Sequence, residues 1–111
     1  MPKSRITFDE TCVALAPPGD APAAWEVAWS RVEEVAAWKD DVFAYDIICV
    51  GLRTAVDPQY VWCDEEADGW VELIDELDRR FGIGIAWLSR IAQPPFAENR
   101  TVLWRSGGAR G

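Results

Sequence analysis

The chain has 111 residues, half of them hydrophobic, and carries a formal net charge of −8. This length predicts a single domain, and this apolar content excludes a disordered body. The negative charge argues against nucleic acid or an anionic membrane as a partner. The sequence contains no histidine, so the usual general base near neutral pH and the commonest metal ligand are both missing. We therefore expect no enzyme activity, no catalytic residues, no cofactor and no metal.

Signals for export or membrane insertion are not visible in the sequence. No apolar stretch approaches the roughly 20 residues that span a bilayer, and no apolar leader segment follows residues 1–5. Cys12, Cys49 and Cys63 are odd in number and match no zinc spacing, so we expect reduced thiols that act as small hydrophobic residues. These features predict a cytoplasmic protein. We expect one globular domain over residues 1–105 and a flexible tail over residues 106–111.

The first third of the chain predicts strands, with one ambiguity. Residues 5–9 alternate polar and apolar side chains, and residues 12–15 form a second short apolar run, so both favour strands. Prolines and a glycine make residues 17–22 a loop. Residues 25–41 fit two structures: helical spacing places tryptophans and valines on one face, whereas the alternation at the start favours strands with a bend at residues 30–31.

The middle of the chain predicts a buried strand and its partner. Residues 45–52 are apolar on both alternating faces, which is typical of a central strand, and residues 60–63 return as the next strand. Asp46 opens this apolar strand, so its carboxylate needs a partner. Lys39, Arg31 or Arg100 could supply an ion pair there.

The clearest element is an amphipathic helix near residues 69–81. Its apolar stripe recurs at helical spacing, and consists of Trp70, Leu73, Ile74, Leu77 and Phe81. We expect Asp68 as its N-cap and Gly82 just beyond its end. A shorter apolar segment follows at residues 85–92, stopped by two prolines, and residues 101–105 predict a final strand.

Acidic residues cluster in the middle of the chain. Residues 57–78 carry nine acids and no Lys or Arg, whereas residues 79–111 carry six arginines and one acid. One interpretation is that these two regions neutralise each other across the fold. The other is an acidic face that steers a basic protein partner. The candidate residues for that face are Asp64, Glu65, Glu66, Glu72, Asp75 and Glu76.

Seven tryptophans are spread along the sequence. Each buries on the order of 150–250 Å² when it is packed, so core packing is the first interpretation. Seven are many for a core this small, so we also expect one or two at an interface.

Residues 29–41 and 45–50, then Gly69–Trp70 and residues 94–104, together resemble a group of small bacterial proteins. These share a pleckstrin-homology-like (PH-like) β-meander closed by a helix. The resemblance implies a curved antiparallel sheet and favours strands over residues 25–39, but it implies no activity. Lipid-binding PH-like members need a basic loop between the first two strands, whereas the sequence here has Asp9, Glu10 and Thr11.

These observations predict an α+β fold: a curved PH-like sheet of five to six antiparallel strands, packed by one helix, with a C-terminal extension. The function that we expect is a non-enzymatic, acidic protein-binding module. Its most concrete form is an immunity- or antitoxin-like inhibitor of a basic protein. The alternative is a homo-oligomeric structural or regulatory domain that buries surplus tryptophan surface by self-association.

Overall fold

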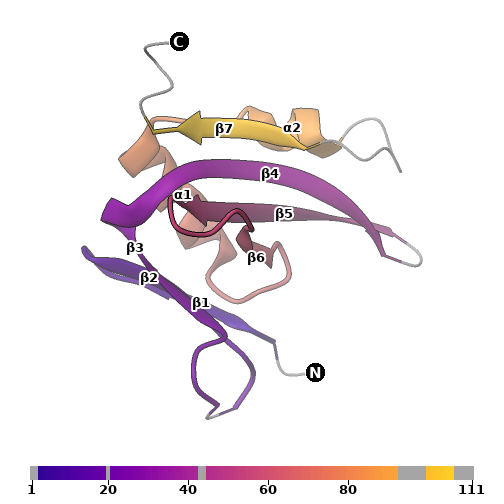
Figure 1. Cartoon of the computed structure of the whole chain (residues 1–111). Helices are drawn as coiled ribbons and strands as arrows, with labels where there is room; N and C mark the ends of the chain where they lie inside the picture. Colours follow the sequence, from indigo (N-terminus) through magenta and orange to yellow (C-terminus); the bar gives the residue numbers. More distant parts are fainter. Residues whose placement is uncertain (1–2, 20, 43–44, 93–99, 107–111) are drawn as a thin grey trace.

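The computed structural model describes residues 3–19, 21–42, 45–92 and 100–106. These residues form two antiparallel sheets and two α-helices, joined by turns and loops. The three-stranded sheet has the order β1 (Arg5–Phe8), β2 (Cys12–Ala16), β3 (Trp25–Ala28). The four-stranded sheet has the order β6 (Val61–Asp64), β5 (Tyr45–Thr54), β4 (Val32–Val42), β7 (Thr101–Arg105). Helix α1 (Trp70–Phe81) lies behind the long β4–β5 hairpin, and helix α2 (Trp87–Ala92) lies behind β7 (Figure 1).

The α+β class and the strand interpretation of residues 25–39 are confirmed, but the sheet differs from the prediction. The described residues form seven strands in two sheets rather than five or six strands in one. A 3₁₀ turn at Trp29–Arg31 separates β3 from β4, at the bend expected near residues 30–31. Because of this turn, β4 does not continue beside β3 and pairs instead with β5 and β7.

The register of β4 and β5 gives the four-stranded sheet two different faces. We call the face toward the helices the inner face; it carries Val35, Ala37, Val50, Leu52 and Cys63. The opposite face, the outer face, carries Glu34, Ala36 and Trp38 from β4, opposite Arg53, Gly51 and Cys49 from β5. This assignment follows from the alternation of side chains along each strand.

The inner face and the helices form the hydrophobic core. Leu73 and Leu77 of α1 and Trp87 and Ile91 of α2 are at most 1 % exposed. Helix α2 contacts β4 and β5, and α1 contacts β1, so the core joins both sheets. The apolar stripe predicted for residues 70–81 is therefore confirmed as a core face.

The two ends of α1 differ in how well they were predicted. Gly82 ends the helix in a left-handed conformation and its N–H donates to the Asp78 carbonyl, as expected. The N-cap is Gly69 at φ 92°, so the prediction of Asp68 is wrong. The backbone of Asp68 instead bonds β1, because the Ile6 N–H donates to its carbonyl at 2.8 Å. A Cβ at Gly69 would lie 2.6 Å from the Ile6 carbonyl oxygen, so only glycine fits this approach.

The C-terminal extension is part of the four-stranded sheet. β7 pairs with β4, and the Ser106 N–H donates to the Glu33 carbonyl at 2.7 Å. The rest of the predicted tail, residues 107–111, and the two prolines predicted to end the second helix lie outside the described residues. Within the described segments, neither helix is long and apolar enough to cross a bilayer.

Candidate functional site

A groove of about 670 Å³ lies where the two sheets meet. Trp25 of β3 and Leu15 of β2 line it from the three-stranded sheet, and β6 lines it from the four-stranded sheet. This volume falls in the range typical of binding sites, and aromatic residues with a few polar groups are the usual lining. The complete lining is Lys3, Ser4, Leu15, Ala24, Trp25, Tyr60, Val61, Trp62, Cys63, Asp64, Glu66 and Ala67.

Two tryptophans define the groove. Trp25 begins β3 opposite Leu15, and its indole N–H donates to the backbone carbonyl of Trp62 at 3.1 Å. The side chain of Trp62 is 47 % exposed, whereas Trp29 and Trp87 are buried in the core. Trp62 is therefore partly exposed, as expected for one or two of the tryptophans, and its place at an interface stays a prediction.

Two carboxylates line the same groove beside these rings. Asp64 ends β6, and its Oδ1 accepts the N–H of Glu66 at 2.9 Å, which fixes the turn that follows the strand. Glu66 follows two residues later and is exposed. Against these two acids the lining contains one cation, Lys3. The groove is therefore both aromatic and acidic.

The other four predicted acidic residues have different positions. Glu65 Oε1 accepts the backbone N–H of Ile48 in β5 at 2.9 Å, so this side chain takes the place that a backbone carbonyl would have in a longer ladder. Glu76 binds Arg79 at 2.5 Å and Arg80 at 2.6 Å, and its pKa is lowered, first by the hydrogen bond from Arg79. Glu72 and Asp75 are exposed on α1. The structure thus brings only Asp64 and Glu66 to the groove, and it uses Glu65 and Glu76 for internal contacts.

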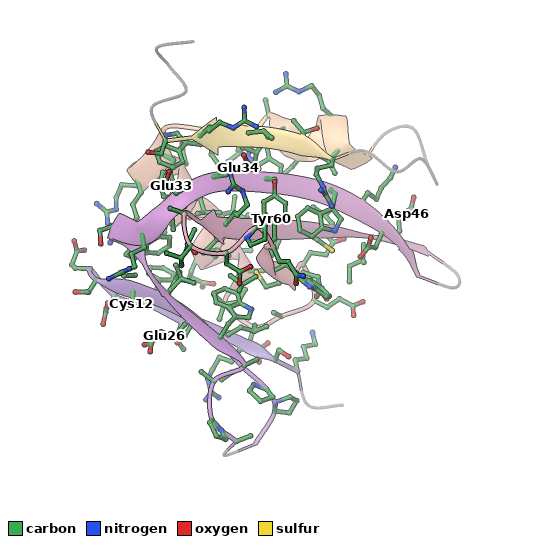
Figure 2. All side chains as sticks on the ribbon, in the orientation of Figure 1. Cys12, Glu26, Glu33, Glu34, Asp46 and Tyr60 are labelled. Carbon is green, nitrogen blue, oxygen red and sulfur yellow. The ribbon has the colours of Figure 1, made fainter. Side chains whose placement is uncertain are left out.

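A polar network on the outer face of the four-stranded sheet was not predicted. Glu34 is 4 % exposed, and it accepts hydrogen bonds from Tyr60 Oη, from Arg105 at 2.9 Å and from Arg53 at 3.3 Å. Figure 2 shows Glu34 and Tyr60 beside each other over this face. Burial opposes ionisation most strongly, but the hydrogen bonds from Tyr60, Arg105 and Arg53 lower the pKa of Glu34 below its usual 4.5.

Two aromatic rings, tilted against each other, lie next to this network. The rings of Trp38 and Tyr60 are 5.6 Å apart, and the Arg100 guanidinium lies 5.3 Å from the first and 5.2 Å from the second. Gly51 lies beneath, where a Cβ would come within 2.6 Å of the Trp38 ring. Tyr60 also lines the groove, so the network holds one of its walls.

Other titratable groups serve the fold. Lys39, 2 % exposed, lies 3.6 Å from Asp46, so one of the ion pairs predicted for that aspartate is confirmed. The pKa values of Cys49 and Cys63 are both raised to about 12, and burial is the largest cause. These thiols are therefore unreactive at neutral pH. No three Cys, Asp or Glu side chains of the described segments are grouped as metal ligands.

The chain matches no family model and no solved structure. Its chemistry therefore has to be inferred from its own residues. Indole faces attract cations, and carboxylates accept charge-assisted hydrogen bonds from Lys and Arg. The groove formed by Trp25, Trp62, Asp64 and Glu66 has both features, so it is suited to holding a basic side chain together with apolar surface.

Proposed function

We propose that the protein is a non-enzymatic, acidic protein-binding module and that a basic partner docks in the groove between the sheets. The observation that carries this proposal is the half-exposed indole of Trp62, in a groove that Asp64 and Glu66 also line. An immunity- or antitoxin-like inhibitor of a basic protein is the most concrete form of the proposal.

Charge and ring chemistry both support a basic partner. The net charge of −8 attracts a cationic protein over long distances and raises its association rate. Tryptophan and arginine are the residues most often responsible for binding energy at interfaces. An arginine from the partner that reaches the groove would meet Trp62 and a carboxylate together, without any change in the core.

A second copy of this chain is the competing occupant. Trp62 and Val102, 47 % and 41 % exposed, are the kind of surface that self-association buries. Two copies would, however, bring like charges together, because each carries −8 and its groove contains two carboxylates. A basic partner removes this repulsion, so it is the favoured occupant.

The resemblance to PH-like bacterial proteins also stands as a proposal. Antiparallel strands and one main amphipathic helix support it. The added α2 and β7 after that helix differ from the usual PH layout, in which the helix ends the domain.

The proposal is tested with the full chain as bait in a lysate of the cells that carry its gene. Any captured basic protein is then purified and its affinity measured by calorimetry. Trp62→Ala is expected to weaken binding by about 2 kcal/mol or more, as at interface hot spots. Glu66→Gln is expected to weaken it several-fold, while the matched variant Asp75→Asn on α1 leaves it unchanged.

Three results would overturn the proposal. One is that no basic protein is retained. Another is that Trp62→Ala binds as tightly as the wild type. The third is a stable dimer in sedimentation equilibrium that the Trp62→Ala variant converts to monomer, because the groove would then be occupied by a second copy.

A further inference from the structure

The edge strand β6 determines how a partner can lie in the groove. In the sheet order β6-β5-β4-β7, β6 is terminal and pairs with β5 on one side only. Residues of β6 line the groove, and Trp25 from its opposite wall reaches the backbone carbonyl of Trp62 on this strand, so the groove extends to the free edge of β6. Edge strands present backbone N–H and C=O groups to any extended chain that approaches.

The register shows which backbone groups face outward. The Glu65 N–H donates to the Ile48 carbonyl at 3.0 Å, and Cys63 pairs with Val50 two positions away. In an antiparallel ladder, residues bonded to the partner strand alternate with residues whose N–H and C=O point away. The outward-pointing residues are therefore Trp62 and Asp64, the two whose side chains are an indole and a carboxylate.

The carbonyls of this edge already have partners within the chain. The Trp62 carbonyl accepts the indole N–H of Trp25 at 3.1 Å, and the Asp64 carbonyl accepts the Ala67 N–H at 3.1 Å. The indole of Trp25 is a side-chain donor, so a backbone N–H of a partner can replace it. The Ala67 N–H is part of a turn and stays in place. A side chain that caps an edge carbonyl also protects the edge from unwanted pairing.

We propose that the partner contributes an extended basic segment that adds to the outer edge of β6 as a further strand. This inference rests on the proposed function and specifies the binding mode at the same groove. The backbone of the segment exchanges hydrogen bonds with Trp62, and the indole of Trp25 moves aside. Alternate side chains of the segment then lie along the groove, where an arginine or lysine meets Trp62, Asp64 and Glu66.

Charge selects this occupant over other extended chains. The groove has two carboxylates against one ammonium group, in a chain of net charge −8. An acidic or neutral strand would gain the same backbone bonds without the ion pairs. An acidic segment would also be repelled by the whole molecule.

The probe is a displayed library of random dodecapeptides, selected on the full chain and counter-selected on Trp62→Ala. Enriched peptides are synthesised with a single N-methyl group moved along the backbone. Strand addition uses every second peptide N–H, so we expect affinity to fall about tenfold or more at alternate positions and little between them. A helical or irregular bound peptide would lack this period of two.

The variant Trp25→Phe gives an independent test, because it keeps an aromatic ring and removes the indole N–H that bonds to the Trp62 carbonyl. A neutral hydrogen bond contributes about 1 kcal/mol, so its loss is expected to free the Trp62 carbonyl and tighten peptide binding about fivefold. Trp70→Phe, made on α1, is the matched control and is expected to leave the affinity unchanged.

The outcomes separate this inference from the proposed function. If a basic protein binds through Trp62 but no linear peptide is enriched, or the N-methyl scan shows no alternation, strand addition is wrong and the proposed function stands. If enriched peptides lack Lys and Arg, the basic character of the segment is wrong. If neither protein nor peptide binds, both proposals fail.

Discussion

The two faces of the four-stranded sheet are built from different chemistry. The inner face meets α1 and α2 through aliphatic side chains such as Val35 and Leu77, both 0 % exposed. The outer face buries a carboxylate, Glu34, under two arginines and a tyrosine, with the tilted rings of Trp38 and Tyr60 beside it. No helix of the described residues covers this second face (Figure 1). The comparison shows that a sheet can be closed on one side by a hydrophobic layer and on the other by its own polar side chains.

The inner face is expected to give the largest loss of stability. Leu77→Ala removes a fully buried side chain between α1 and the sheet, so the free energy of unfolding should fall by about 3–4 kcal/mol. Urea denaturation measures it. Val71→Ala, on the same helix but 67 % exposed, is the control and should change the free energy by less than about 0.5 kcal/mol. Equal losses would mean that α1 does not pack as described.

The outer face is expected to give the next largest effect through its central carboxylate. Glu34→Ala leaves Tyr60, Arg53 and Arg105 without their acceptor. The arginines reach solvent, so we expect a loss of about 2–3 kcal/mol rather than the full cost of a buried charge. Glu33→Ala, one residue away, is the control. A loss no larger than that of Glu33→Ala would show that the network adds nothing to stability.

Close packing on the outer face predicts a smaller loss. In Gly51→Ala the new methyl group would come within 2.6 Å of the Trp38 ring and 3.1 Å of the Tyr60 Cβ, so the Trp38 ring must move. We expect a loss of about 1–2 kcal/mol. Combining it with Trp38→Leu in a double-mutant cycle should recover part of this loss. Strictly additive effects would contradict the contact.

The two faces should also differ in pH dependence. The pKa of Glu34 is lowered in the folded chain, so its contribution is present above the unfolded value near 4.5 and is lost as the pH falls below it. Leu77, packed against the inner face, carries no titratable group. The stability gap between wild type and Glu34→Gln should therefore shrink as the pH falls from 6 to 3, whereas the gap for Leu77→Ala should persist. Urea midpoints across this range measure both.

The smallest effect concerns thiols, one on each face. Cys49 on the outer face and Cys63 on the inner face are at most 3 % exposed, with pKa values raised to about 12, while Cys12 is partly exposed. Ellman's reagent should therefore titrate one thiol in the native protein and three in urea. Rapid reaction of Cys49 without unfolding would mean that the outer face opens.

The sequence predicted local elements better than their assembly. The helix at residues 70–81 could be predicted from its apolar stripe and from Gly82, because both are local sequence signals. The division into two sheets depends on the turn at Trp29–Arg31, where three residues decide which strand β4 pairs with. Periodicity describes one strand at a time and carries no information on pairing partners.

The candidate site shows the same limit. Asp64 and Glu66 were among the predicted acidic residues, because the charge distribution is visible in one dimension. Nothing local distinguished them from Glu65 or Glu76, which bond to Ile48 and to Arg79. Glu34 was missed because its partners Tyr60 and Arg105 are 26 and 71 residues away in the chain. The available signal was a glutamate at an otherwise apolar position of β4.

Trp29 anchors the turn between β3 and β4 to the β1–β2 turn and to α1. Its indole N–H donates to the Asp9 carbonyl at 2.9 Å, its backbone N–H donates to the Thr11 carbonyl at 2.9 Å, and Arg80 of α1 stacks on its ring. The junction between the sheets is thus held at both the backbone and the side chain. Because one side chain holds the chain where it leaves one sheet for the other, the loss of Trp29 would loosen this turn, the β1–β2 turn and α1 together.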